Sequence, residues 1–424
     1  MRSIEVLVIG GGASGMMAAI EAKRQGAKVL LLEKKPRLGK KLLATGNGKC
    51  NFTNQLQEKN CYRSEQKEFP WKVVEAFGCQ QTVDWFHKIG ILAKDKGGYV
   101  YPASEQATSV VHALEREIQR LKIEVHTEEW VEEIKPHTGK GNSGMAGYNV
   151  STQKDSYLAK KVILSTGGKA APVHGSTGDG YVLAESLGHH LVFPVPALTS
   201  LILEENVKAW SGVRIQGKVS LLDEKEQLLC EDTGEIQMVS YGISGIPVFQ
   251  ISRYAAREIA NGKKVYLLLD CMPDKDKEWI YQELQYQKEQ NEKQSAGDLL
   301  EGIFPDKLIG VLLKKSDISI KESVSNLTDR QIWHLVHQIK KLQFQVKEVS
   351  DFEKAQVTAG GISAKEIETD TMESKICKGL YLTGEVVDVD GICGGYNLQW
   401  AWASGYTAGR ASAAAIKKER NVCK

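Results

Sequence analysis

The sequence predicts an α/β protein whose main domain is built from both ends of the chain, with a β-rich module and a small helical module inserted between them. Three observations support this fold class. A strand pattern, a glycine turn and a helical pattern open the chain at residues 4–25. A second strand, a glycine-rich loop and an alanine-rich helical pattern close it at residues 379–418. Pro194 and Pro196 mark the point where short strands, and then polar helices, replace the α/β pattern.

The opening segment combines the parts of a dinucleotide-binding turn. A strand runs into the glycine turn 10–15, which has the form G-x-G-x-x-G, and a helix follows it. Gly10 permits the tight turn, Gly12 leaves room for a pyrophosphate, and Gly15 lets the helix pack closely on the strand. The free N–H groups at the helix start suit the phosphates. The second strand ends on Glu33, whose carboxylate suits ribose hydroxyls, so the segment predicts a Rossmann-like unit.

The bulk composition is that of a globular protein with two or three domains. The chain has 424 residues, of which 42% are hydrophobic and 25% are charged. A net charge of +2 points neither to nucleic acid nor to an anionic membrane. The chain has no apolar run long enough to span a bilayer and no signal-peptide pattern at its start. The eight cysteines are scattered without a C-x-x-C pair. We therefore expect a cytoplasmic protein, with the oligomeric state left open.

Metal binding is not expected. The close histidine pairs are His189-His190 and His334 with His337. Neither pair has a cysteine or an acidic residue at the spacing that a metal site needs. The sequence therefore assigns no metal to the protein.

Changes in pattern set the predicted domain bounds. Residues 1–192 and 352–424 carry the α/β patterns and are predicted to form one domain, with a continuous helix over residues 71–89. Residues 193–273 contain short strands and turns, which predict a β-rich module. Residues 274–351 are polar and helical. Two interpretations of this helical module stay open: an exposed subdomain, or a lid over a substrate.

The closing segment favours FAD over a nicotinamide cofactor. A nicotinamide dehydrogenase needs one Rossmann unit, whereas this chain returns to a nucleotide-type segment near its end. After a strand, Glu385, Asp388 and Asp390 are placed to hydrogen-bond the sugar-alcohol chain of FAD. The helix that begins near Asn397 would direct its N-terminus at the flavin pyrimidine ring and favour negative charge there. The alternative is that these acids are ordinary loop residues.

Eight motifs spread over the chain carry a resemblance to a known family. They are VIGGGASGMMAAI (8–20), GKKLLATGNGKCN (39–51), STGG (165–168), GSTGDGY (175–181), YGISG (241–245), VTAGGI (357–362), TMESK (371–375) and GLYLTGEVVDVDGICGGYNLQWAWASG (379–405). With these motifs the chain resembles the bacterial NAD(P)/FAD-dependent oxidoreductases, also labelled aminoacetone-oxidase-family FAD-binding enzymes. That family includes the BaiN-like flavoproteins and resembles the flavoproteins with two dinucleotide-binding domains.

The resemblance implies an FAD-binding Rossmann-like domain from both chain ends, a β-barrel-like inserted module and a small helical module. It also implies that lysines in the loop after the second strand act as point charges near the pyrophosphate, and that a strand backbone meets the adenine. The residues it assigns to FAD are Gly10, Gly12, Ala13, Ser14, Gly15, Glu33, Lys40, Lys41, Gly46, Asn47, Val131, Thr166, Gly167, Glu385, Asp388, Asn397 and Leu398.

The protein needs no nucleophile of its own, because FAD carries the hydride step. Reduction of an alkene also uses a proton, for which a side chain is a suitable donor. Candidates are Tyr396, Tyr241, His174 and Cys393. Tyr396 lies in the loop next to the predicted flavin ring, and a packing role suits it equally well. Cys50 and Cys393 lie in predicted cofactor loops, but a redox thiol would need a partner and a low pKa.

Three functions remain open. We favour an NAD(P)H-driven reductase of an activated C=C bond, such as an enone in a steroid-like or bile-acid-like substrate. Because the sequence shows no second Rossmann turn, NAD(P)H is expected as a transient donor. The second possibility is an oxidase of a small amine or aminoketone that uses O2. The third is a flavin-dependent RNA-modifying or RNA-binding protein, which requires a basic face. Residues 34–49 are basic, but the cofactor phosphates account for part of that charge.

Overall fold

The structure, a computed structural model, describes residues 2–138 and 146–422. A second literal G-x-G-x-x-G match, at residues 139–144, is predicted from the sequence as a hairpin loop and lies outside the described residues. Among the described residues, no helix combines the length and apolar character that crossing a bilayer requires.

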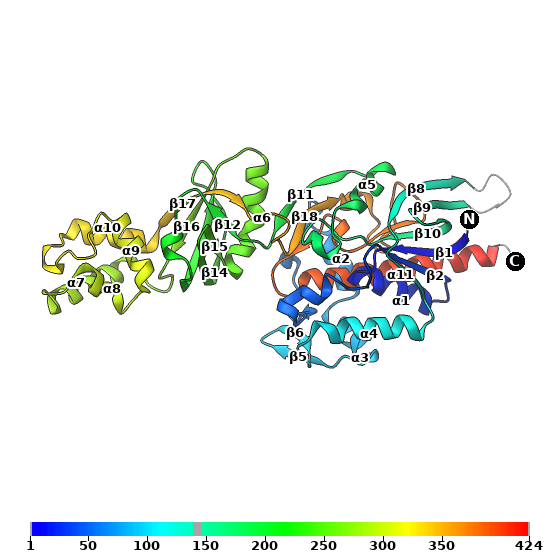
Figure 1. Cartoon of the computed structure of the whole chain (residues 1–424), viewed down its shortest axis with the longest axis horizontal. Helices are drawn as coiled ribbons and strands as arrows, with labels where there is room; N and C mark the ends of the chain where they lie inside the picture. The colour runs from blue at the N-terminus through cyan, green and yellow to red at the C-terminus, as the bar shows by residue number, and fades with distance from the viewer. Residues whose placement is uncertain (1, 139–145, 423–424) are drawn as a thin grey trace. The chain divides into compact units, whose positions relative to one another are not determined.

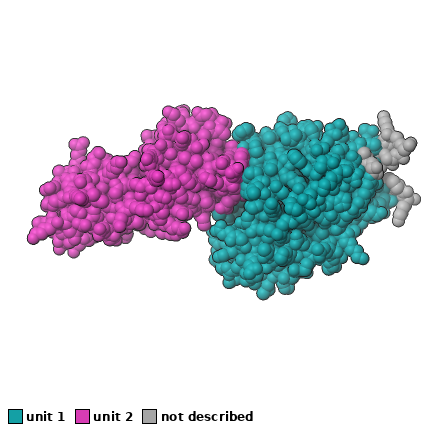
Figure 2. Space-filling model, in the orientation of Figure 1, with its two compact units in different colours: residues 1–194, 357–424 teal, residues 195–356 magenta. Residues whose placement is uncertain are grey.

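The chain is divided into two compact units (Figure 2). Unit 1 contains residues 1–194 and 357–424, and unit 2 contains residues 195–356. Both ends of the chain therefore belong to the same unit. The chain leaves unit 1 along β11 (Leu191–Ala197) and returns along β18 (Val357–Ile362), and these two strands pair with each other.

A seven-stranded, mainly parallel sheet forms the centre of unit 1 (Figure 1). Its order is β7-β2-β1-β10-β9-β8, and β19 pairs in parallel with β10. Strands β8 and β9 are antiparallel to their neighbours. The inner strands are apolar because both faces of a parallel sheet are buried. The strands are β1 (Arg2–Ile9), β2 (Val29–Glu33), β7 (Glu124–Thr127), β8 (Val131–Thr138), β9 (Ala146–Thr152), β10 (Ser156–Leu164) and β19 (Leu380–Leu382).

Helices from opposite ends of the chain lie side by side in unit 1, with α11 running along α1 (Figure 1). A Cβ on Gly405 would lie 2.4 Å from the Ser14 carbonyl oxygen, and one on Gly409 would lie 2.4 Å from that of Ala18. These glycines therefore allow the backbones of the two helices to come into direct contact. The helices of unit 1 are α1 (Ala13–Arg24), α2 (Phe69–Ala76), α3 (Cys79–Lys88), α4 (Ala107–Arg120), α5 (Asp179–Ser186) and α11 (Tyr396–Val422).

The prediction of one continuous helix over residues 71–89 is wrong. The segment forms two helices, because Phe77 leaves the helical region at φ −144° and ψ 78°. Gly78 is extended and starts α3, and its N–H donates to Oε1 of Gln81 over 3.2 Å. A helical apolar pattern continues across the break, so the break could not be predicted from periodicity.

Short strands complete unit 1. Three of them form a small antiparallel sheet in the order β3-β6-β5, and another two form the pair β20-β4. Pairing in the small sheet joins Thr53 to Val100, so it links two distant parts of the sequence. These strands are β3 (Thr53–Asn54), β4 (Tyr62–Arg63), β5 (Ala93–Lys96), β6 (Tyr99–Pro102) and β20 (Asp390–Gly391).

Unit 2 contains a closed barrel, which confirms the predicted barrel-like module (Figure 1). The strand order is β12-β15-β14-β13-β16-β17. Alternate side chains such as Val219, Leu221 and Leu267 are buried, as expected for one inward face per strand. The strands are β12 (Leu201–Leu203), β13 (Arg214–Leu222), β14 (Leu228–Val239), β15 (Gly242–Ser244), β16 (Val265–Asp270) and β17 (Leu342–Val349).

Two elements of this unit were not predicted from the sequence. Helix α6 (Ile246–Ala260) packs on β14, in a part of the chain where only strands are expected. Strand β17 closes the barrel, in a part predicted to be helical. The other helices, as expected from the polar pattern, are α7 (Lys277–Gln290), α8 (Ala296–Glu301), α9 (Asp306–Lys315) and α10 (Asp329–Lys340).

Candidate functional site

The turn between β1 and α1 is tightly packed except at one glycine. Gly10 has φ +103°, and a Cβ there would lie 2.4 Å from the Ser165 carbonyl oxygen. A Cβ on Gly15 would lie 1.9 Å from the Gly10 carbonyl oxygen. A Cβ on Gly12, by contrast, would meet nothing within 4 Å. No side chain caps the start of α1. The helix therefore presents N–H groups to an open space, which fits the pyrophosphate of a dinucleotide.

Glu33 is fixed beside this turn at the end of β2. Its Oε2 accepts a hydrogen bond from the Gly11 N–H over 2.7 Å, and its Oε1 accepts one from the Lys35 N–H over 2.7 Å. Burial raises the pKa of the Glu33 carboxyl, and the two hydrogen bonds oppose that rise. Each oxygen keeps a further lone pair, so the carboxylate remains able to accept from ribose hydroxyls.

The start of β8 is held against the same end of β2. The Glu129 N–H donates to the Glu33 carbonyl oxygen over 3.0 Å, and the Glu128 N–H donates to that of Lys35 over 3.2 Å. Val131, two residues after Glu129, is buried at the first position of β8. Val131, which is predicted to contact the adenine, therefore lies two residues after a position that is hydrogen-bonded to Glu33.

Positive charge gathers in the loop after β2. Burial lowers the pKa of His174, and the charges of Lys40, Lys41 and Lys35 lower it further. Its Nδ1 is buried and has no hydrogen-bond partner within residues 2–138 and 146–422. Lys41 Nζ also lies 2.8 Å from Oε2 of Glu385. Lysines around a neutral imidazole form a setting that suits an anionic group.

The closing segment packs on the opening turn. A Cβ on Gly384, where φ is +71°, would lie 2.5 Å from the Ser14 Oγ. Oε1 of Glu385 accepts a hydrogen bond from the Thr358 N–H over 2.7 Å. Glu385 therefore stands between the lysine loop and the start of β18, at the same edge of the sheet as the glycine turn.

Other residues that are predicted to bind FAD make contacts within the protein. Oδ2 of Asp388 accepts a hydrogen bond from the Glu65 N–H over 2.9 Å. Oδ1 of Asn397 accepts from the Gly391 N–H over 2.8 Å, and its Nδ2 donates to the Gly391 carbonyl over 3.0 Å. Leu398 is half-buried in the first turn of α11. These side chains shape the loop before α11, and their contact with FAD stays a prediction.

Thr166 and Gly167 follow β10 at the same edge. The Ser165 N–H donates to the Ile9 carbonyl over 2.9 Å, which ties this segment to the end of β1. A Cβ on Gly180 would lie 1.9 Å from the Thr166 Oγ1. The first turn of α5 therefore packs directly on Thr166.

The loop η1 (Leu42–Gly48) carries three consecutive residues with positive φ, Gly46 at +56°, Asn47 at +53° and Gly48 at +81°. Just after it, Oδ1 of Asn51 is buried and finds no hydrogen-bond partner in the described part of the chain. A Cβ on Gly395 would lie 2.8 Å from this oxygen. Buried acceptors are nearly always paired, so an open one between two glycine loops fits an N–H donor of a bound cofactor.

The proposed catalytic candidates differ in burial and in the unit to which they belong. Tyr396 is buried against Tyr62, with ring centroids 5.8 Å apart, and burial raises its pKa. Cys393 is half-buried and forms no disulfide with another cysteine of the described residues. Cys50 is buried, and burial raises its pKa to about 12, so it is not a ready thiolate. Tyr241 belongs to unit 2, whereas the other candidates and the glycine turn belong to unit 1.

Two tyrosines that the sequence analysis did not select lie over these loops. A Cβ on Gly394 would be 2.8 Å from Cε1 of Tyr99, and one on Gly46 would be 3.9 Å from Cε1 of Tyr101. Side chains alternate along a strand, so both tyrosines of β6 share one face and Val100 points to the other. The alternating Tyr-Val-Tyr pattern indicates a strand with both tyrosines on one face. It does not indicate which loops they contact, because the loops around Gly46 and Gly394 are distant in sequence.

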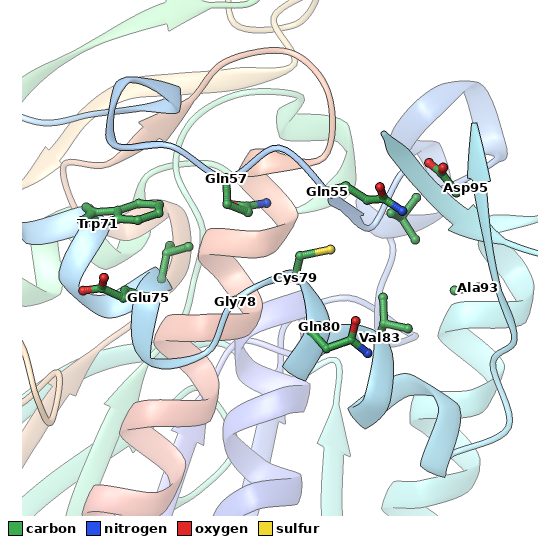
Figure 3. A pocket seen from close by; sticks show the side chains of 12 residues that line it. Gln55, Gln57, Trp71, Glu75, Gly78, Cys79, Gln80, Val83, Ala93 and Asp95 are labelled. Atoms are coloured by element: carbon green, nitrogen blue, oxygen red, sulfur yellow. The ribbon is translucent and has the colours of Figure 1, made fainter. Parts of the chain in front are cut away.

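The opposite face of this small sheet lines a cavity of about 740 Å³ (Figure 3). Its walls come from α2, α3, β5 and the loop after β3, and Cys79 projects into it. The lining includes the carboxylates Glu75 and Asp95 and no basic side chain. The cavity therefore does not suit the phosphates of a nucleotide, in contrast to the lysine loop.

The structure combines a Rossmann-like sheet, an open glycine turn and an acid at the end of the second strand. The closing segment returns to the same edge of the sheet. Together these features define an FAD-binding type of flavoprotein. The family described as HI0933-like protein Rossmann domain matches residues 4–411. The chain belongs to this family, and the predicted class, an FAD-dependent oxidoreductase, is confirmed.

Two relatives and one solved structure are similar over nearly their whole length. The 3-dehydro-bile acid delta(4,6)-reductase of Clostridium scindens is 43% identical, over 96% of this chain and 98% of the relative. A ribosomal RNA dihydrouridine synthase of Escherichia coli is 28% identical, over 96% of this chain and 97% of the relative. The 3-ketosteroid delta1-dehydrogenase from Sterolibacterium denitrificans has a TM-score of 0.50 at 13% identity, over 98% of this chain and 100% of that one. The last comparison shows similarity of fold.

Proposed function

We propose that this protein reduces an activated C=C bond in a hydrophobic, steroid-like or bile-acid-like substrate, with NAD(P)H as the electron source. One observation carries the proposal. Identity with the Clostridium scindens reductase is 43% and spans nearly both chains, so it includes the cofactor domain and the inserted unit alike. The name of that relative places its reduction at the 4 and 6 positions of an oxidised bile acid.

The residues that we propose for FAD divide by the part of the cofactor they would hold. The glycine turn and lysines suit the pyrophosphate, Glu33 and the start of β8 suit the adenosine, and the segments around Gly46 and α11 suit the flavin. Bound there, FAD would supply the hydride transfer. The set is Gly10, Gly12, Ala13, Ser14, Gly15, Glu33, Lys40, Lys41, Gly46, Asn47, Val131, Thr166, Gly167, Glu385, Asp388, Asn397 and Leu398.

NAD(P)H is proposed to dock only while it delivers electrons. The open glycine turn between β1 and α1 is the turn that we propose for FAD. The sequence has no second G-x-G-x-x-G turn between a strand and a helix that could hold NAD(P)H. The described cysteines form no disulfides. Cysteines without disulfides and a nicotinamide donor both suit the cytoplasm, which we propose as the location.

RNA modification is the alternative that a relative favours, because saturating uridine is also the reduction of a C=C bond. Two ion pairs argue against a basic face in the loop after β2. Lys34 pairs with Asp179, and Lys41 pairs with Glu385. Part of the positive charge in residues 34–49 is therefore neutralised inside the protein, which leaves less for a polyanion.

The test separates the electron donor from the acceptor. The purified FAD-loaded protein is mixed without oxygen with NADH or NADPH, and the visible flavin absorbance is followed. The reduced protein is then mixed with a 3-oxo-Δ4 steroid, with ribosomal RNA, or with air. The proposal predicts bleaching by one nicotinamide and reoxidation by the steroid, with a product that has gained two hydrogens by mass spectrometry.

Other outcomes would replace the proposal. Reoxidation by RNA and not by steroids would establish the modification alternative. A protein that resists both nicotinamides, is reduced by an amine and releases peroxide in air would be an amine oxidase. In either case the steroid assignment would be wrong.

A further inference from the structure

Tyr101 lies at the loops that form the flavin end of the proposed FAD site. Its ring edge faces Gly46, at 3.9 Å from the position of a Cβ there, and Tyr99 on the same face of β6 covers Gly394. The β3-β6 pairing fixes this placement, because Asn54 pairs with Tyr99 directly after the buried Thr53. The backbone hydrogen bonds of the small sheet therefore fix the position of Tyr101 relative to these loops.

The Tyr101 hydroxyl is available to a ligand. No group in the described ranges 2–138 and 146–422 hydrogen-bonds it, and the side chain is half-buried. Other tyrosines near these loops are committed elsewhere. The Tyr62 hydroxyl donates to Oε1 of Gln57 over 2.6 Å, and Tyr396 is buried with a hydrogen bond to the Cys61 thiol.

The surroundings of Tyr101 keep its phenol protonated. Burial raises the pKa of Tyr101, and the nearby Tyr99, Cys393 and Glu105 raise it further. A general acid must hold its proton until the reaction needs it. Lys96 Nζ lies 5.7 Å from the centroid of the Tyr101 ring and also pairs with the Glu105 carboxylate, so Tyr101 lies beside an ion pair.

We propose that Tyr101 is a catalytic residue of the reduction and that its hydroxyl donates the proton. This inference rests on the proposed function. Reduction of C=C adds a hydride to one carbon and a proton to the other. The hydride and its two electrons come from the NAD(P)H of the proposed function. The proton comes from the Tyr101 O–H bond, a C–H bond forms, and the phenolate recovers a proton from water.

The test compares Tyr101→Phe with Tyr99→Phe in the FAD-loaded protein. Both changes remove one hydroxyl from the same face of β6, so Tyr99→Phe is the matched control. We expect Tyr101→Phe to keep its FAD, its reduction by NAD(P)H and its affinity for the saturated 3-oxo steroid, measured by the shift of the flavin spectrum. Reoxidation by the unsaturated 3-oxo steroid should slow by about 100-fold, whereas Tyr99→Phe should stay within about twofold of the parent.

A second replacement keeps the ring and changes only its acidity. A fluorinated tyrosine in place of Tyr101 has a more acidic phenol, so the alkaline limb of the reoxidation rate should move to lower pH. Equal reoxidation rates and pH profiles in all variants would overturn the assignment. Loss of FAD or of steroid affinity in proportion to rate would also overturn it, since that pattern marks a packing residue. If the parent protein itself is not reoxidised by any unsaturated steroid, the proposed function fails and this inference with it.

Discussion

Lys41 and Glu385 form an ion pair across 344 residues of sequence, with Nζ 2.8 Å from Oε2. The lysine belongs to the loop after β2, and the glutamate belongs to η7 (Gly384–Val386) in the closing segment. The pair therefore joins the two ends of the chain at the edge where the glycine turn opens. Because Glu385 also accepts the Thr358 N–H over 2.7 Å, its carboxylate holds three separate segments together.

Removing the positive end of this pair should weaken FAD binding. Lys41→Met leaves Glu385 without its cation and takes a point charge from the proposed pyrophosphate site. Exposed ion pairs contribute little alone, but with the phosphate interaction we expect the Kd for FAD to rise about tenfold. Titration of the FAD-free protein, followed by flavin fluorescence, measures this. Lys49→Met is the control, since Lys49 is exposed in the same basic segment. Equal Kd values for both variants and the parent would contradict the role of Lys41.

Two glycines of the opening turn should fail in different ways. Gly12 has φ −79° and ψ −168°, which valine tolerates, and its Cβ would enter open space. Gly12→Val should therefore fold with the stability of the parent and bind no FAD. Gly15→Ala places a Cβ 1.9 Å from the Gly10 carbonyl and should lose about 3 kcal/mol of stability. Circular dichroism melting and flavin absorbance distinguish the cases. A yellow, folded Gly12→Val protein would refute the pyrophosphate assignment.

The local parts of the fold could be predicted from the sequence. The turn 10–15 and the acid Glu33 follow a spacing that short-range geometry enforces, and the structure places Glu33 at hydrogen-bond distance from Gly11. The helix that ends the chain was expected for the same reason, as its pattern repeats over many turns. These features depend on neighbours a few residues away, so one sequence carries them.

The missed features depend on distant partners. Strand β17 forms because it pairs with β16 and with β12, which both lie well back in the chain. Tyr101 reaches the glycine loops because β6 pairs with β3, and nothing near Tyr101 in sequence marks that pairing. The backbone conformations of Phe77 and Gly78 split one apolar helical pattern into two helices. Pairing partners and chain reversals are set by the whole fold, which periodicity alone does not report.

The packing of α1 on α11 should tolerate no side chain at Gly409. A Cβ there would lie 2.4 Å from the Ala18 carbonyl oxygen, and a helix backbone cannot move aside without losing contacts along its length. Gly409→Val should cost about 3 kcal/mol or more. Gly310→Ala is the control, because Gly310 lies inside α9 with nothing within 4 Å.

Urea unfolding of the FAD-free proteins, followed by circular dichroism, measures both changes. Gly310→Ala should leave the protein as stable as the parent or raise its stability by up to about 1 kcal/mol, since alanine favours a helix. If Gly409→Val unfolds at the same urea concentration as Gly310→Ala, the close packing of the two terminal helices is not what holds them.

Acid should destabilise the protein through His189. Its Nδ1 lies 3.0 Å from Oε2 of Glu366, and its Nε2 lies 2.9 Å from the Ser374 Oγ. Burial lowers the pKa of His189, although Glu366 favours the charged form. The folded protein therefore takes up this proton at lower pH than the unfolded chain, whose imidazole has its ordinary pKa of 6.5. Below that pH the unfolded chain binds more protons, so the free energy of unfolding falls as the pH drops.

Glu366 acts in the same direction at lower pH. Hydrogen bonds from His190 and His189 lower its pKa against the opposing effect of burial, so stability is lost again as its carboxylate protonates. His189→Gln removes the first step and leaves the hydrogen bonds from His190 to Glu366 in place. We expect this variant to be less stable at neutral pH by about 1–3 kcal/mol, because buried partners lose a hydrogen bond, and to show a flatter pH dependence just below 6.5. Urea unfolding at a series of pH values tests this, with the exposed His112→Gln as control. A slope for His189→Gln as steep as that of the control would assign the acid sensitivity to other groups.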